Sequence, residues 1–175
     1  MKLKNNIFTA LLLTIGFILH QITPGILGGM KFDFLLSFIF ISIFLNSTFR
    51  NTMLTALLGG ILSAMTTTFP GGQIPNLIDK LVTCLILFII IKGIQHFKLN
   101  SFIVALISGL GTFISGTTFL ISALLITGLP VPLKVLMITV VLPTILINGV
   151  GTAFLYGIIK RALKLSGVTV DNFNA

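Results

Sequence analysis

The sequence predicts an all-α integral membrane protein, a single bundle of six membrane-spanning helices with both termini in the cytoplasm. Of its 175 residues, 55% are hydrophobic and 8% are charged, whereas a typical soluble domain has about 25% charged residues. The mean hydropathy is +1.16. A chain of this composition could not cover its surface with polar groups in water. Because one spanning helix takes about 20 apolar residues, a chain of this length with short loops accommodates about six.

The apolar runs and the turns between them divide residues 1–175 into helices of one domain, without a soluble appendage. The first run follows Lys2 and Lys4 and lacks a clear small-residue cleavage site, so we interpret it as a span and not as a signal peptide. Turns rich in glycine or proline follow the first, third and fifth runs. The expected spans are residues 5–21, 32–46, 52–68, 76–93, 101–127 and 135–159.

Small and polar residues in the last two helices indicate how these helices pack. Ala105, Gly109 and Gly116 fall on one stripe, and small residues let helix backbones approach each other closely in lipid. Pro143 is expected to kink the last helix. Asn148 lies near mid-depth in that helix, where we expect its amide to form an interhelical hydrogen bond.

Basic residues predict the orientation, because cytoplasmic segments of membrane proteins are enriched in lysine and arginine. With the N-terminus in the cytoplasm, eight basic residues fall on the inner side: Lys2, Lys4, Arg50, Lys92, Lys98, Lys160, Arg161 and Lys164. Three fall on the outer side, namely Lys31, Lys80 and Lys134. We therefore expect a multi-pass membrane protein with both termini in the cytoplasm. Since the basic residues are spread along helix ends, the net charge of +8 does not indicate a nucleic-acid partner.

No pattern of catalytic or metal-binding residues is visible in the sequence. The single cysteine, Cys84, lies in an apolar run and is expected in the core. The chain lacks HExxH, G-x-S-x-G and the phosphate-binding GxxxxGK[ST]. We therefore expect neither enzyme activity nor a cofactor or metal. The less favoured alternatives are a membrane hydrolase that uses His20 with Asp33 or Asp79, and a pore component.

The segment FPGGQIPNLIDK, residues 69–80, is a polar, sharply turning stretch between two apolar runs. Asn76, Asp79 and Lys80 are spaced so that they share one helix face. Charged residues within membrane spans are costly and usually mark a site or a pathway. Asp171, in the polar tail, is expected to be a solvated charge. The segment therefore predicts one wall of a small-molecule site at the outer end of the bundle.

A second segment of similar design predicts the opposite wall. Asp33, like Asp79, follows a Gly-Gly pair and has a lysine close by in the sequence. A carboxylate can hold an ammonium group and a lysine can hold a carboxylate, so the two walls suit a zwitterion such as an amino acid. The alternative is two ion pairs, Lys31 with Asp33 and Lys80 with Asp79, that fix the helix ends. The candidate substrate-binding residues are His20, Gly28, Gly29, Lys31, Asp33, Phe69, Gly71, Gly72, Gln73, Asn76, Asp79 and Lys80.

PGILGGMKFDFLL (residues 24–36) and FPGGQIPNLIDKL (residues 69–81) resemble the bacterial tryptophan transporter family, TrpP-type. The resemblance continues through GTFISGTTFL and VVLP and covers nearly the whole chain. It implies a six-span protein that takes up tryptophan and binds it near the extracellular face. The layout is also similar to the substrate-binding (S) components of energy-coupling factor (ECF) vitamin transporters. Those proteins work with a transmembrane coupling protein and ATPases, for which Ala10 and Thr14 here have the spacing of a docking patch.

The resemblance also suggests roles for the candidate residues. Phenylalanine side chains would flank the indole ring, and the loop of residues 25–30 would close over it, with glycines as hinges. The candidates are Asp33 and Asp79 for the ammonium, Lys31 and Lys80 for the carboxylate, and Gln73 and Asn76 for the indole N–H. The alternative is an ECF-type subunit for another flat heterocycle or vitamin.

Overall fold

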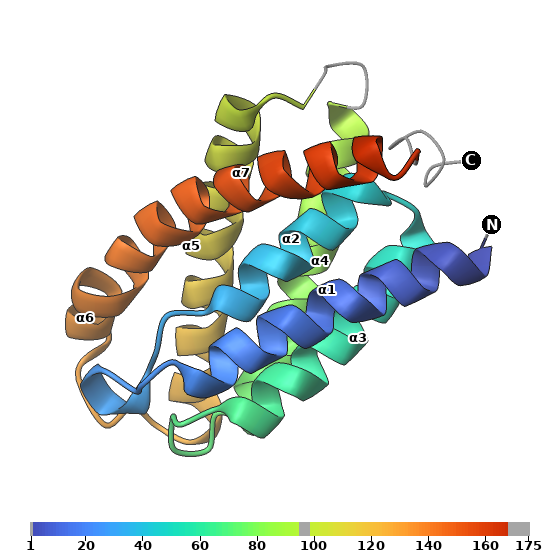
Figure 1. Ribbon diagram of the computed structural model, residues 1–175. Coiled ribbons are helices and arrows are strands. Elements are labelled where there is room, and N and C mark those ends of the chain that lie inside the picture. Colours follow the sequence, from blue (N-terminus) through green and yellow to red (C-terminus); the bar gives the residue numbers. More distant parts are fainter. Residues whose placement is uncertain (1, 95–98, 168–175) are drawn as a thin grey trace.

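The computed structural model describes residues 2–94 and 99–167 as a bundle of long helices (Figure 1). No strand is present within these ranges. The elements are α1 (Lys2–Ile22), η1 (Leu27–Gly29), α2 (Phe34–Leu45), α3 (Phe49–Thr66), α4 (Gln73–Gly93), α5 (Ser101–Ile126), and a last rod of α6 (Leu133–Leu136), η2 (Met137–Val141) and α7 (Leu142–Leu165). The predicted all-α class is confirmed. Lys98, predicted on the inner side, and Asp171, predicted as a solvated charge, lie outside the described residues.

Side-chain caps explain where three of the helices begin. The side chains of Asp33, Thr48 and Asn100 each accept a hydrogen bond from the backbone N–H three residues further on, at the starts of α2, α3 and α5. The cap at Thr48 starts α3 before the predicted residue 52. α4 starts before the predicted residue 76, because Pro75 fits within a first helical turn, where backbone N–H groups have no helical acceptor.

The second helix, α2, is the centre of the bundle. Every residue from Leu35 to Leu45 is buried, as expected for a helix that is apolar on all sides. It contacts α1, α3, α4, α5 and α7, and Figure 1 shows it between α1 and the last rod. The outward faces of the surrounding helices are apolar; Leu11, Leu146 and Phe154 are among the exposed side chains. This pattern fits a surface that lies against lipid.

Four helical segments of the described chain are long and apolar enough to cross a bilayer: Leu27–Leu45, Gln73–Gly93, Ser101–Ile126 and Leu133–Leu165. Asn6–Ile22 is a shorter apolar helix. α3 has 18 residues but is less apolar, because its first turn contains Arg50 and Asn51. The described residues thus form six helical rods, of which four qualify as spans by length and hydropathy. The count of six spans stays a prediction. The single-domain organisation stays a prediction.

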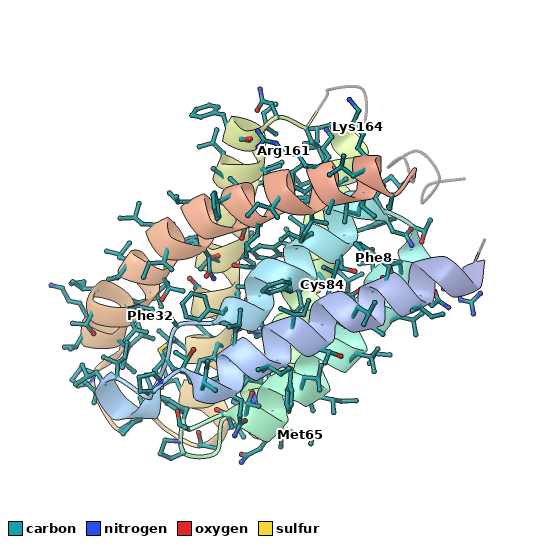
Figure 2. All side chains as sticks on the ribbon, in the orientation of Figure 1. Phe8, Phe32, Met65, Cys84, Arg161 and Lys164 are labelled. Carbon is teal, nitrogen blue, oxygen red and sulfur yellow. The ribbon has the colours of Figure 1, made fainter. Side chains whose placement is uncertain are left out.

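The start of α1 and the end of α7 lie at the same end of the bundle, which we call the terminal end (Figure 1). Arg161 and Lys164 lie there, whereas Phe32 lies at the opposite end, the loop end (Figure 2). This separation agrees with the grouping of basic residues on which the orientation rests. The orientation in the membrane itself stays a prediction.

Two features of the last rod concern the residues singled out in the sequence. A π-helical turn, Met137–Val141, precedes Pro143, so the irregularity expected at the proline takes the form of a wider turn just before it. Asn148 is fully buried, and its Nδ2 donates to the Asp33 carbonyl at 3.2 Å and to Thr112 Oγ1 at 3.4 Å. Its Oδ1 accepts from Ser37 Oγ at 3.3 Å. The predicted interhelical role of Asn148 is confirmed.

Candidate functional site

Three connecting segments, residues 23–33, 67–72 and 127–132, meet at the loop end. The Thr68 hydroxyl donates to the Gly29 carbonyl at 2.5 Å. A Cβ atom at Gly29, where φ is +79°, would lie 2.4 Å from the Thr68 carbonyl oxygen. A Cβ atom at Gly71, where φ is +68°, would lie 2.3 Å from the Thr127 side chain. The segments interlock at these points because glycine has no side chain and tolerates positive φ.

Directly beneath these segments lies a cavity of about 60 Å³. Eight of the candidate residues line it: His20, Gly29, Lys31, Asp33, Phe69, Asn76, Asp79 and Lys80. Gln73 is exposed and does not line it. Gly28, Gly71 and Gly72 do not line it either and belong to the interlocked segments and to the start of α4. The two polar segments predicted as walls therefore do converge on one space.

The cavity also has a third wall that the sequence did not predict. It comes from α5 and the last rod, through Thr112, Ser115, Gly116, Phe119, Val141 and Thr144. In the sequence these residues look like helix-packing positions, since small and hydroxylated residues are common at such positions in membrane bundles. The π-helical turn brings Val141 against Gly116, where an added Cβ would lie 2.7 Å from a Val141 methyl group. A π-helical turn is itself frequent at functional sites, but a sequence does not display it.

A cluster of charged groups forms one side of the cavity. Lys80 Nζ lies 2.5 Å from Asp33 Oδ2 and 2.6 Å from Asp79 Oδ2. The Lys80 and Asp79 side chains are 1% exposed, and that of Asp33 is 17% exposed. The sequence suggested separate pairs, Lys31 with Asp33 and Lys80 with Asp79. The first pairing is wrong, because Asp33 at the start of α2 lies beside α4 and shares the Lys80 ammonium with Asp79.

Lys31 has a different environment. Its Nζ donates to the backbone carbonyl of His20 at 2.9 Å, and no carboxylate of the described residues lies within 4.0 Å of it. An ammonium group carries three N–H donors. Lys31 therefore faces the cavity with donors to spare.

The imidazole of His20 lies between α3 and the start of α2. Its Nδ1 is 2.6 Å from Thr66 Oγ1, and its Nε2 is 3.8 Å from Asp33 Oδ1. The side chain is buried, although the sequence placed it only at the end of a helix. His20 thus ties α1 to α3 while one edge of its ring borders the cavity.

One carboxylate and one amide of α4 complete the polar side of the cavity. Asp79 Oδ1 accepts from the Thr83 hydroxyl at 3.0 Å. Asn76 Nδ2 donates to the Gly72 carbonyl at 2.8 Å. Among the described residues, Asn76 Oδ1 has no hydrogen-bond donor. It is an acceptor available to a molecule in the cavity.

An aromatic pair forms the apolar side of the cavity. The rings of Phe69 and Phe119 lie edge to face, with centroids 5.2 Å apart and an angle of 82° between their planes. Both side chains are buried and line the cavity. The site can therefore contact a molecule that carries both signs of charge and a flat apolar part. Within the described ranges, no three metal-ligating side chains gather in one place.

Comparison with known proteins finds relatives that are named for tryptophan transport. The "Probable tryptophan transport protein" of Clostridium acetobutylicum is 44% identical over 166 residues, which cover 94% of this chain and 96% of that protein. Proteins of the same description from Clostridium perfringens and Bacillus subtilis are 42% and 39% identical, over 94% and 95% of this chain and 97% and 96% of their own lengths. No solved structure matches the chain. The family model described as "Tryptophan transporter TrpP" matches residues 2–164, and the chain belongs to this family.

Proposed function

We propose that this protein takes up tryptophan across the bacterial cell membrane and binds the zwitterionic amino acid in the loop-end cavity. One observation carries the proposal: opposite charges and an aromatic pair line the same buried space. The printed names of the three relatives supply the substrate. A family of transporters is expected to carry its substrate unchanged, so we assign no catalytic step.

The contacts support a division of the cavity between the parts of the substrate. Lys80 donates to two carboxylates, whereas Lys31 donates only to a backbone carbonyl. Lys31 is therefore the better partner for the substrate carboxylate, in a charge-assisted hydrogen bond. The indole would lie against Phe69 and Phe119, because aromatic rings prefer offset or edge-to-face contacts. Asn76 Oδ1 would accept the indole N–H.

We infer that part of the cavity wall moves when the substrate enters, because the connecting segments interlock above the cavity at Gly29 and Gly71. Separation of these segments would admit the substrate from the outer side, and their return would shield it from water.

The test uses the absence of tryptophan from the chain. Any indole fluorescence of the purified protein then comes from bound ligand. We expect the emission of added tryptophan to shift on binding, and titration calorimetry to give the same affinity, with leucine and thiamine as controls. Binding of thiamine without binding of tryptophan would contradict the proposal and support the vitamin-type alternative.

Energy coupling is a separate part of the proposal. We infer a transmembrane coupling partner with ATPases that docks on α1, where Ala10 and Thr14 lie on an exposed face. The variant Ala10→Leu should lower tryptophan uptake by cells while the purified protein keeps its tryptophan affinity. Uptake that persists after ATP depletion but stops when the proton gradient is collapsed would contradict this part and favour proton coupling.

A further inference from the structure

The contact between His20 and Asp33 depends on which imidazole nitrogen carries the proton. The Thr66 hydroxyl donates to the Leu62 carbonyl at 2.8 Å, so its oxygen is the acceptor in the 2.6 Å contact with His20 Nδ1. We assign the proton of that contact to Nδ1 on this basis. A neutral imidazole has one donor and one acceptor nitrogen. In this tautomer, His20 Nε2 is therefore an acceptor.

The atom that faces Nε2 is an acceptor as well. Asp33 Oδ1 already accepts the backbone N–H of Leu36 at 3.0 Å, and Asp33 Oδ2 accepts from Lys80. Nε2 and Oδ1 are 3.8 Å apart, which is too far for a hydrogen bond. Among the described residues no donor lies between them, and both side chains border the cavity. One donor group placed beside this 3.8 Å gap, at the edge of the cavity, could bond to both atoms.

We propose that this gap is the seat of the substrate's ammonium group, which donates one N–H to His20 Nε2 and another to Asp33 Oδ1. Two acceptors 3.8 Å apart can both lie about 2.8–2.9 Å from a single nitrogen, the usual length of a charge-assisted bond. The assignment rests on the proposed function and deepens it, because it makes a primary amine a required feature of the substrate. His20 is then a specificity-determining residue and not only a tie between helices.

The charges around the gap favour a zwitterion over a simple amine. Facing His20 are Asp33 of the α2 start, Lys80 of α4 and Lys31 of the loop, and Asp79 lies behind Lys80. With a neutral His20, the negative charges of the two carboxylates and the positive charges of the two ammonium groups sum to zero. An added zwitterion keeps the balance, whereas an added amine without a carboxylate leaves one uncompensated positive charge in a buried space.

The experiment compares three ligands: tryptophan, its des-amino analogue indole-3-propionate, and tryptamine, which lacks the carboxylate. It uses two substitutions of the same histidine. His20→Asn keeps a polar group near the position of Nδ1, and hence near Thr66, but has no atom at Nε2. His20→Gln carries an amide atom at about the distance of Nε2.

We expect His20→Asn to weaken tryptophan and tryptamine binding by about ten- to a hundredfold, as for the loss of a hydrogen bond to a charged group. Indole-3-propionate should bind to this variant as it does to the wild type, and His20→Gln should recover part of the tryptophan affinity. Lys31→Met provides the matched opposite pattern: weaker tryptophan and indole-3-propionate binding, with no weakening of tryptamine binding, since the variant has one positive charge fewer beside the amine.

Equal weakening of all three ligands in His20→Asn would overturn the inference, since it would show that His20 acts only through the fold. Unchanged tryptophan binding in that variant would also overturn it and would leave the proposed function standing. Failure of the wild-type protein to bind tryptophan would instead refute the proposed function. The three results are distinct, because unchanged indole-3-propionate binding reports that the cavity is intact.

Discussion

Two buried polar clusters lie at opposite ends of this bundle, and they differ in kind. At the terminal end, Thr9, Ser42, Asn51 and Thr55 join α1, α2 and α3 through hydrogen bonds such as Thr9 Oγ1 to Asn51 Oδ1 at 2.8 Å. Asn51 Nδ2 also donates to the Asn46 carbonyl at 2.8 Å. All these groups are neutral, and donors meet acceptors. We call them the terminal-end cluster.

The loop-end cluster consists of charged groups around a cavity, and its hydrogen bonding is incomplete. Among the described residues, Lys31 has spare N–H donors and Asn76 Oδ1 has no donor, and in the tautomer assigned above no proton lies between His20 Nε2 and Asp33 Oδ1. In these two clusters, the neutral hydrogen-bonded contacts connect helices, whereas the charged groups border the cavity. Four substitutions test this division.

Lys80→Met should have the largest effect. It leaves Asp33 and Asp79 buried without their shared cation, and breaking a buried ion pair from one side costs about 3–5 kcal/mol. We expect the free energy of unfolding in detergent to fall by about this amount, together with loss of tryptophan binding. Lys31→Met is the control, with a smaller loss of stability because its partner is a backbone carbonyl. Equal destabilisation by the two substitutions would contradict the bridging role of Lys80.

Asn51→Leu should lower stability without changing the site. The substitution leaves Thr9 and the Asn46 carbonyl without their partner, at a cost of about 1–3 kcal/mol. Thermal unfolding should show the loss, while the tryptophan affinity of the folded protein, measured by calorimetry, stays within about twofold of the wild type. A large loss of affinity would mean that the two clusters are not separate in function.

Gly29→Ala should loosen the cover of the cavity. A Cβ atom there would meet the Thr68 carbonyl at 2.4 Å, at a φ of +79°, and such backbone strain costs about 1–3 kcal/mol. We expect faster dissociation of tryptophan in stopped-flow fluorescence. Gly151→Ala is the control, because a Cβ at this helical position meets nothing within 4 Å and alanine favours helix by about 1 kcal/mol. The idea fails if Gly29→Ala leaves the dissociation rate unchanged.

Phe119→Leu should have the smallest effect. It removes one member of the aromatic pair, and a ring contact contributes about 0.5–1.5 kcal/mol beyond its buried area. Tryptophan binding should weaken by about two- to tenfold. The same substitution should not weaken the binding of an aliphatic amino acid, which has no ring to lose the contact. A loss shared by both ligands would remove Phe119 from the indole side.

Much of the fold and part of the site could be predicted from the sequence. The all-α membrane class follows from composition, and Asp33, Asp79 and Lys80 could be expected together because each belongs to a polar turn at the same end. Asn148 could be recognised as an interhelical contact, because an amide at mid-depth in a membrane bundle needs partners. These features follow from the high cost of placing polar or charged groups in lipid, which makes each such residue informative on its own.

The remaining part of the site depends on which helix faces contact each other. Separation along the sequence does not predict these contacts. Nearness in the chain suggested Lys31 as the partner of Asp33, yet Lys80 of α4 holds that carboxylate. Thr112 and Phe119 resemble ordinary packing residues until α5 is placed against the start of α2. The π-helical turn that positions Val141 has no sequence signature of its own.

The ion-pair bridge of Lys80 has a consequence for how the site is neutralised. Two carboxylates this close would attract sodium or potassium ions from the medium, but here the neutralising cation is part of the chain and cannot diffuse away. These two acids therefore have a fixed counter-ion and do not depend on the salt composition of the medium.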